Sequence, residues 1–141
     1  MEHTESHPMK IHVFRLHPGQ DLKAEIDTYT KTHAIQAAVV VSCVGALTKA
    51  TIRMAGARKM NTYEEDFEIV SLVGTAESGY SHLHIAFSSE EGQMIGGHLK
   101  SPSIVGTTAE VVLGEIEDLT FERVFDEETG CKELVVKQKT C

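Results

Sequence analysis

Beyond residue 36 the chain is a succession of short apolar segments separated by turns, and this pattern allows few structures other than a β-sheet. In residues 66–75, for example, Phe67, Ile69 and Val73 fall on one face of an extended strand. Further strands are predicted at 10–16, 37–44, 50–54, 105–116, 119–125 and 132–136, with a hairpin over 81–99.

A single helix precedes most of these strands. It is predicted over residues 21–33 by side chains that share one face at helical spacing, namely Leu22, Ile26, Tyr29 and His33. One early helix followed by seven or eight strands predicts an α+β domain with a strongly curved, largely antiparallel β-sheet. Several strands are apolar on both faces, and one helix cannot cover that surface, so we also expect a subunit interface.

The composition is that of one ordinary domain, since 141 residues with 41% hydrophobic content can bury a core. Residues 1–8 are polar and are predicted to form a disordered leader. They lack the apolar run of a signal peptide, and no segment approaches the roughly 20 apolar residues of a membrane-spanning helix, so a cytoplasmic or nuclear location is expected. The chain has three cysteines, Cys43, Cys131 and Cys141. They are too widely spaced for a zinc finger and imply no disulfide framework.

The net charge of −8 argues against a protein that grips duplex DNA, because neutralising phosphates requires a basic patch. The 13 basic residues are scattered and outnumbered by 21 acidic ones. The nearest approach to a cluster is Arg53, Arg58 and Lys59, which we interpret as part of a solvated loop or strand edge. Direct DNA binding is therefore predicted to be weak.

The segment 81–99 carries the residues best suited to chemistry. His82 and His84 lie two apart, so on a strand they point to the same face. After a turn signal, the return through Gly96-Gly97 would bring His98 alongside them. Three imidazoles arranged in this way suit zinc, with a fourth position open for water or a substrate oxygen. Each imidazole is expected to donate its second ring N–H to a carbonyl or carboxylate.

An alternative is that the alternating histidines simply lie on a solvated or half-buried sheet face. The glycine pair Gly96-Gly97 favours the metal site, because residues without a side chain let two backbones approach closely. The remaining histidines lie on the leader, the first strand or the helix end, and none is expected to be a ligand: His3, His7, His12, His17 and His33.

Catalysis at such a zinc ion would also need a general acid or base. Glu110 is the first candidate, since it lies among apolar residues on a strand that is expected to be interior. Its alternative role is a structural hydrogen bond or ion pair with Arg53 or Arg123. Ser71 has no G-x-S-x-G context and is interpreted as a buried, hydrogen-bonded hydroxyl.

Four segments resemble, in the same order, motifs of the plants-and-prokaryotes-conserved (PPC) domain. They are FEIVSLVG at 67–74, GQMIGG at 92–97, TAEVV at 108–112 and TFER at 120–123. The resemblance extends roughly over residues 9–137, leaving 138–141 as a tail, and is to the stand-alone prokaryotic type of the domain. It implies an α/β protomer with an antiparallel sheet that assembles as a homotrimer.

The resemblance also implies two hypotheses about function. Plant members join the domain to an AT-hook and act as nuclear chromatin regulators, and stand-alone relatives are assigned to DNA binding by that analogy. Neither Arg53 nor Arg58 lies in the Arg-Gly-Arg-Pro context of an AT-hook. The histidine set is similar to those of acetolactate decarboxylase and a group of zinc-dependent ester hydrolases. One hypothesis is therefore a trimeric zinc protein that binds or turns over a small molecule as a hydrolase or lyase. The other is a non-catalytic module that binds proteins or associates with DNA.

Overall fold

The computed structural model describes residues 5–140, which form one helix and eight strands. In chain order they are β1 (Met9–Leu16), α1 (Leu22–Thr32), β2 (Ala38–Arg53), β3 (Met60–Tyr63), β4 (Phe67–Glu77), β5 (Tyr80–Ser88), β6 (Met94–Ile116), β7 (Leu119–Asp126) and β8 (Cys131–Gln138). Residues 1–4 of the predicted leader, with His3, lie outside the described residues, as does Cys141. Within residues 5–140, no helix is long and apolar enough to cross a membrane.

Helix α1 lies where the sequence predicts it. The side chain of Asp21 caps its first turn by accepting a hydrogen bond from the backbone N–H of Ala24 at 3.0 Å. Its apolar face contains Leu22 and Ile26, which are fully buried. This face packs mainly on β6, with smaller contacts to β5 and β4, so the helix closes one side of the core.

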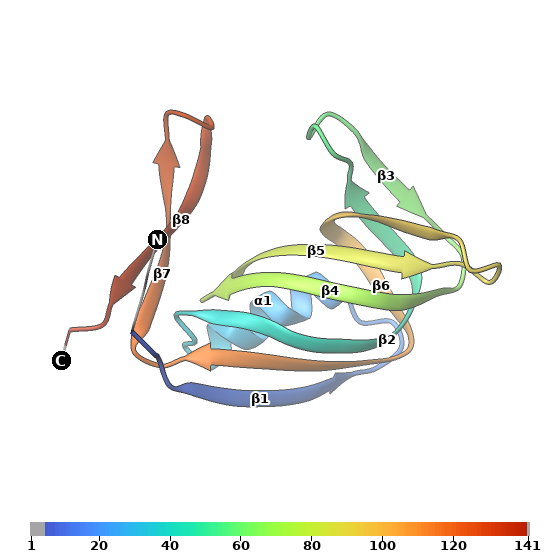
Figure 1. Cartoon of the computed structure of the whole chain (residues 1–141). Helices are drawn as coiled ribbons and strands as arrows, with labels where there is room; N and C mark the ends of the chain where they lie inside the picture. Colours follow the sequence, from blue (N-terminus) through green and yellow to red (C-terminus); the bar gives the residue numbers. More distant parts are fainter. Residues whose placement is uncertain (1–4, 141) are drawn as a thin grey trace.

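Six strands form an antiparallel sheet in the order β1-β6-β5-β4-β2-β3, and a further pairing of β6 with β2 closes four of them into a barrel-like ring. Strands β7 and β8 form a separate hairpin. Figure 1 shows this hairpin standing at one end of the sheet and the end of β2 with β3 rising at the other, while β4 and β5 cross between them. The predicted fold, one helix with a strongly curved antiparallel sheet, is confirmed.

The core inside the ring determines which side chains can face outward. Phe67 on β4 and Phe87 on β5 pack edge to face, with ring centroids 4.6 Å apart. Other buried side chains surround them, among them Leu47, Ile52, Ile85, Leu99, Val105 and Val111. Because alternate residues of a strand point to opposite faces, burial of Leu83 places His82 and His84 on the outer surface of β5.

Strands β2 and β6 are both longer than the sequence predicts. The segments 37–44 and 50–54 belong to a single 16-residue strand, and the return of the hairpin and 105–116 belong to a single 23-residue strand. The pairing of β2 with β6 shifts register at four places, so Gly45 and Pro102 lie at irregularities within continuous strands. The predicted division of each of these strands into two segments is therefore wrong, because the irregularities lie within continuous strands.

The predicted orientation of Val73 is also wrong. A register shift between Ile69 and Ser71 in the pairing with β5 inserts one extra residue into β4 as a β-bulge. The insertion reverses the alternation that follows, so Leu72 is buried while Val73 is 55% exposed. Val73 pairs with His84 and shares its outward face.

The outer face of β1 and β2 is apolar and uncovered within one chain. Its exposed side chains are Met9, Ile11, Val13, Val41 and Val44. Glu110 of β6 is exposed on the same face, because it pairs with Arg15 on one side and with Val44 on the other. The strands expected to be buried on both faces therefore expose one face in the isolated chain.

Candidate metal centre

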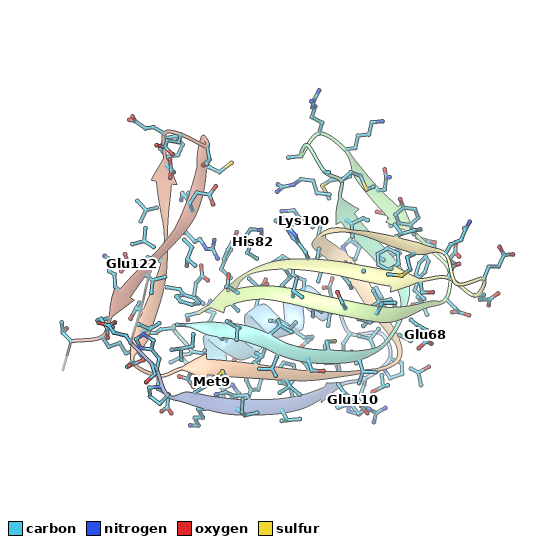
Figure 2. The ribbon with its side chains drawn as sticks, viewed as in Figure 1. Met9, Glu68, His82, Lys100, Glu110 and Glu122 are labelled. Carbon is cyan, nitrogen blue, oxygen red and sulfur yellow. The ribbon has the colours of Figure 1, made fainter. Side chains whose placement is uncertain are left out.

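The three histidines lie on neighbouring positions of β5 and β6. His84 pairs directly with His98, and His82 follows two residues from His84 on the same face of β5. The row continues onto β2, where Arg53 pairs with His98. Lys100 lies two residues beyond His98 on β6 and so starts a second row beside the first. Figure 2 shows His82 and Lys100 on the same side of the sheet, between the two upright hairpins.

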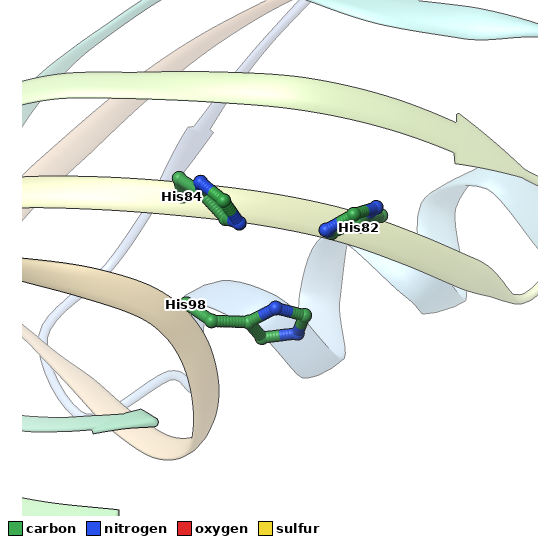
Figure 3. Close-up of side chains that lie close together, drawn as sticks. All are labelled: His82, His84 and His98. Carbon is green, nitrogen blue, oxygen red and sulfur yellow. The ribbon is translucent and has the colours of Figure 1, made fainter. Parts of the chain in front are cut away.

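The three rings converge closely enough to share one ion. Their centroids are 5.2 Å apart for His82 and His84, 4.9 Å for His82 and His98, and 5.4 Å for His84 and His98. One nitrogen of each ring lies within 4.8 Å of the others (Figure 3). Zinc bound tetrahedrally at about 2.0–2.1 Å holds its nitrogens about 3.3 Å apart. Side-chain rotations that move each nitrogen by about 1 Å would complete that geometry.

The glycine pair has the role that the sequence predicts. A Cβ on Gly96 would lie 2.8 Å from the carbonyl oxygen of Ile85, and a Cβ on Gly97 would lie 2.8 Å from that of Arg53. Both distances are too short for a side chain, so the glycines allow β6 to lie close to β5 on one side and to β2 on the other. His98 reaches the other two histidines because of this close approach.

The surroundings keep two of the imidazoles neutral. Burial, together with the positive charges of Arg53 and Lys100, lowers the pKa of His98 to about 4, and burial has the largest effect. Burial, His84 and Arg123 likewise lower the pKa of His82. A neutral imidazole has a free lone pair, which is the form that binds a metal ion. At neutral pH these two side chains are therefore in the protonation state that metal binding requires.

The hydrogen bonding of His98 differs from the prediction. Its Nδ1 accepts a hydrogen bond from Nη2 of Arg53 at 3.3 Å, whereas a carbonyl or carboxylate acceptor was expected. A guanidinium has only donors, so it occupies the lone pair that a metal would use. Among the described residues, no hydrogen-bond acceptor contacts the ring nitrogens of His82 or His84. The sequence interpretation of Arg53 as a solvated edge residue misses this contact, which depends on the long-range pairing of β2 with β6.

Two hollows of about 320 Å³ flank the histidines. The first is lined by His84, His98, Arg53 and the loop at 54–57. The second lies toward the β7–β8 hairpin, and its lining residues are Val73, Gly74, Thr75, His82, His84, Arg123, Glu133 and Leu134. A small molecule could reach the open side of the histidine set from either hollow.

The β7–β8 hairpin is attached to the sheet beside His82 through Arg123. Its Nε donates to Oε1 of Glu77 at 2.7 Å, and its Nη2 donates to the hydroxyl of Thr75 at 2.9 Å. Thr75 is the residue that pairs with His82. The sequence pointed to Arg123 through the TFER motif and as a possible partner of Glu110, and nothing marked Glu77 as its partner.

Glu110 is not brought to the histidines. It lies on the outer face of β1, β2 and β6 described above, 12 positions along β6 from His98. Neither Arg53 nor Arg123 is its partner, because the first donates to His98 and the second to Glu77. Glu133 is the carboxylate that influences His82. Its negative charge raises the pKa of His82, but the larger effects of burial, His84 and Arg123 lower it.

The remaining described histidines have other surroundings. His7 contacts the carboxylate of Asp118 at 3.0 Å, and the ring of His12 lies between the hydroxyl of Tyr29 and the carboxylate of Glu115. Within residues 5–140, only one group of three or more potential ligands converges, formed by His82, His84 and His98. His3 lies outside those residues.

The sequence of residues 3–117 matches the Plants and Prokaryotes Conserved (PCC or PPC) domain. This chain belongs to that family. Three of the four motifs recognised in the sequence lie within the matched residues, and the TFER segment at 120–123 follows them. The β7–β8 hairpin that carries Arg123 begins at Leu119, so it follows the residues that match the PCC domain.

Two curated relatives place the PCC domain in larger proteins. The chain is 38% identical over 129 residues to the bifunctional protein GlmU of Synechococcus sp. (strain JA-2-3B'a(2-13)), covering 92% of this chain and 20% of GlmU. It is 26% identical over 131 residues to the AT-hook motif nuclear-localized protein 27 of Arabidopsis thaliana, covering 82% and 42% respectively. The chain thus spans about a fifth of the first relative and less than half of the second.

Two solved structures share the PCC fold over almost the whole chain. A hypothetical protein from Salmonella enterica is 33% identical, with a TM-score of 0.93, and the match covers 98% of this chain and all of that one. A protein from Archaeoglobus fulgidus described as metal-containing is 26% identical, with a TM-score of 0.73, and the match covers 94% and 99%.

Proposed function

We propose that this PCC-domain protein binds one zinc ion per subunit through His82, His84 and His98, and that the ion's open position holds a small-molecule ligand. The observation that carries the proposal is the convergence of the three ring nitrogens within 4.8 Å on one outward face of the sheet. Three imidazole nitrogens with room for a fourth ligand match the donor set of catalytic zinc sites. The metal-containing relative from Archaeoglobus fulgidus supports the proposal.

Zinc in such a site supplies Lewis-acid chemistry of the hydrolase and lyase type, by polarising a carbonyl or lowering the pKa of bound water to about 7. The chain's own residues would orient the ligand. His84 lines both hollows, so a ligand could contact the open side of the site from either direction. Glu133 and Arg123 line the hollow beside the hairpin, so Glu133 replaces Glu110 as the carboxylate placed to exchange a proton there.

We also propose that the protein assembles as a homotrimer through the outer apolar face of β1 and β2. Monomers rarely expose several large aliphatic side chains on one strand face, and Val13 and Val44 are 69% and 54% exposed. The number of subunits is the one implied by the PPC resemblance. In such a trimer Glu110 would be buried, as the apolar residues around it in the sequence predict.

The test of the zinc proposal is the metal content of purified variants. The wild-type protein should contain one zinc ion per subunit, and the His84→Ala variant should contain none. His17→Ala and His33→Ala serve as controls, because both side chains are exposed and lie outside the cluster. A His84→Ala variant that retains the full zinc content would refute the proposed site.

A further inference from the structure

Two cations, Arg53 and Lys100, lie next to the histidines and have no carboxylate partner in the part of the chain that the structure describes. Arg53 lies across from His98 on β2, and Lys100 lies two residues beyond His98 on the same face of β6. The other basic side chains of the region have partners, since Lys23 pairs with Asp27 and Arg123 pairs with Glu77. Among residues 5–140, no acidic group forms an ion pair with Arg53 or Lys100.

This arrangement is unfavourable unless something negative binds there. The chain contains 21 acidic residues and has a net charge of −8, so carboxylates for pairing are plentiful. Both cations are partly buried, which weakens the screening of their mutual repulsion by water. Three neutral imidazoles would also leave the charge of a bound divalent ion uncompensated. The site therefore concentrates positive charge in a protein that is otherwise negative.

Metal binding would release Arg53 for a second partner. A neutral imidazole has one N–H and one lone pair, and the lone pair of His98 Nδ1 accepts from Arg53. If a metal binds Nδ1, it takes that lone pair. If a metal binds Nε2, the ring proton moves to Nδ1, where it faces the N–H of Arg53. The hydrogen bond between Arg53 and His98 is lost in both cases, which leaves the guanidinium fork free beside the ion.

We propose that Arg53 and Lys100 form an anion-binding subsite that holds the carboxylate or phosphate group of the ligand while another oxygen of that ligand binds the metal. The inference rests on the zinc site proposed above and specifies the class of molecule it accepts. The hollow of about 320 Å³ lined by Arg53, His84 and His98 gives such a molecule access to the metal ligands and to the guanidinium of Arg53. A guanidinium binds carboxylate and phosphate oxygens in pairs, and the lysine adds a second charge.

The experiment compares anions on cobalt-loaded protein, in which ligand exchange changes the visible spectrum. The probes are acetate, inorganic phosphate and the neutral acetamide, and the variants are Arg53→Met and Lys100→Met. Arg58→Met and Lys59→Met are matched controls. These two cations are exposed in the loop between β2 and β3, and neither lines the hollow. Zinc affinity is measured separately on each variant by competition with a chelator.

At least one anion should bind the wild-type protein at least tenfold more tightly than acetamide, and the preferred one distinguishes carboxylate from phosphate ligands. Arg53→Met should weaken anion binding about tenfold or more, while zinc binding becomes tighter because a competing donor and a repelling charge are gone. Arg53→Lys should restore part of the anion affinity. Equal binding of anions and acetamide, or equal effects of the Arg53 and Arg58 variants, would overturn the subsite and leave the zinc site intact. Absence of zinc from the wild-type protein would overturn both.

Discussion

Replacing Gly97 by alanine tests whether the close packing of three strands creates the metal centre. The new Cβ would lie 2.8 Å from the carbonyl oxygen of Arg53 and 3.3 Å from Cδ1 of Ile52. Ordinary contacts begin at 3.4 Å, so β6 and β2 must separate by about 0.6 Å. Overpacking of this kind costs about 1–3 kcal/mol, and alanine recovers about 0.5–1 kcal/mol by restricting the unfolded chain. The net loss of stability should be about 1 kcal/mol, within a range of about 0–2.5 kcal/mol.

The same displacement moves His98 away from His82 and His84, so zinc affinity should fall about tenfold, as it does when supporting contacts of a metal site are disturbed. The matched control is Gly106→Ala on the same strand, where the nearest neighbour of the Cβ would be the methyl group of Thr48 at 3.2 Å and the nearest backbone atom would be 3.7 Å away, an ordinary contact distance. Urea unfolding of the metal-free proteins gives the stability, and chelator competition gives the affinity. If both variants behave alike in both assays, close approach at Gly97 does not position His98.

Three further predictions use other parts of the molecule. In the metal-free protein, NMR titration should give His98 a pKa of about 4, below the usual 6.5, and a normal pKa would contradict this. The stability that neutral His98 contributes above pH 6.5 should be lost as the pH falls toward 4. Burial raises the pKa of Cys43 to about 11, so in a Cys131→Ser/Cys141→Ser background this thiol should resist a thiol reagent at pH 8. The stability that the Cys43 thiol contributes below pH 9 should be lost as the pH rises toward 11. Because the net charge is −8, fluorescence anisotropy should give a Kd for duplex DNA weaker than about 1 μM at ~150 mM salt, and tighter specific binding would favour the DNA-associated hypothesis.

Local sequence patterns predicted most of the fold because they report which residues alternate between faces. They predicted helix α1 and the strands around it, and they placed His82 and His84 on one face of β5. They failed at Val73, because a single inserted residue in β4 reverses the alternation and leaves no mark in composition. They also divided β2 and β6, because glycine and proline have the same local signal at a bulge as at a strand end.

The polar part of the site was harder to predict than the histidines. His98 could be predicted because a hairpin and two glycines link it to His84 through a short loop. Arg53 reaches His98 only through the pairing of β2 with β6, which joins residues 45 positions apart and contains four register shifts. A change of one residue in that register would turn Arg53 to the opposite face. Its role can therefore be seen only in the folded chain.

The contact of Arg123 with Glu77 explains how a hairpin outside the main sheet can form part of the site. Their side chains are only 12% and 10% exposed, and the guanidinium also lies 5.1 Å from the ring of Tyr80. Oε2 of Glu77 is buried without a hydrogen-bond partner among the described residues, so removing Arg123 would leave a buried carboxylate with neither oxygen in an ion pair. Breaking one half of such a pair typically costs about 3–5 kcal/mol, much more than a surface ion pair contributes. The hairpin is consequently fixed beside His82, and with it Glu133 on the opposite strand of the hairpin. The chain thus holds the histidines and Arg53 on paired strands of the sheet, while one buried ion pair fixes the wall on the other side.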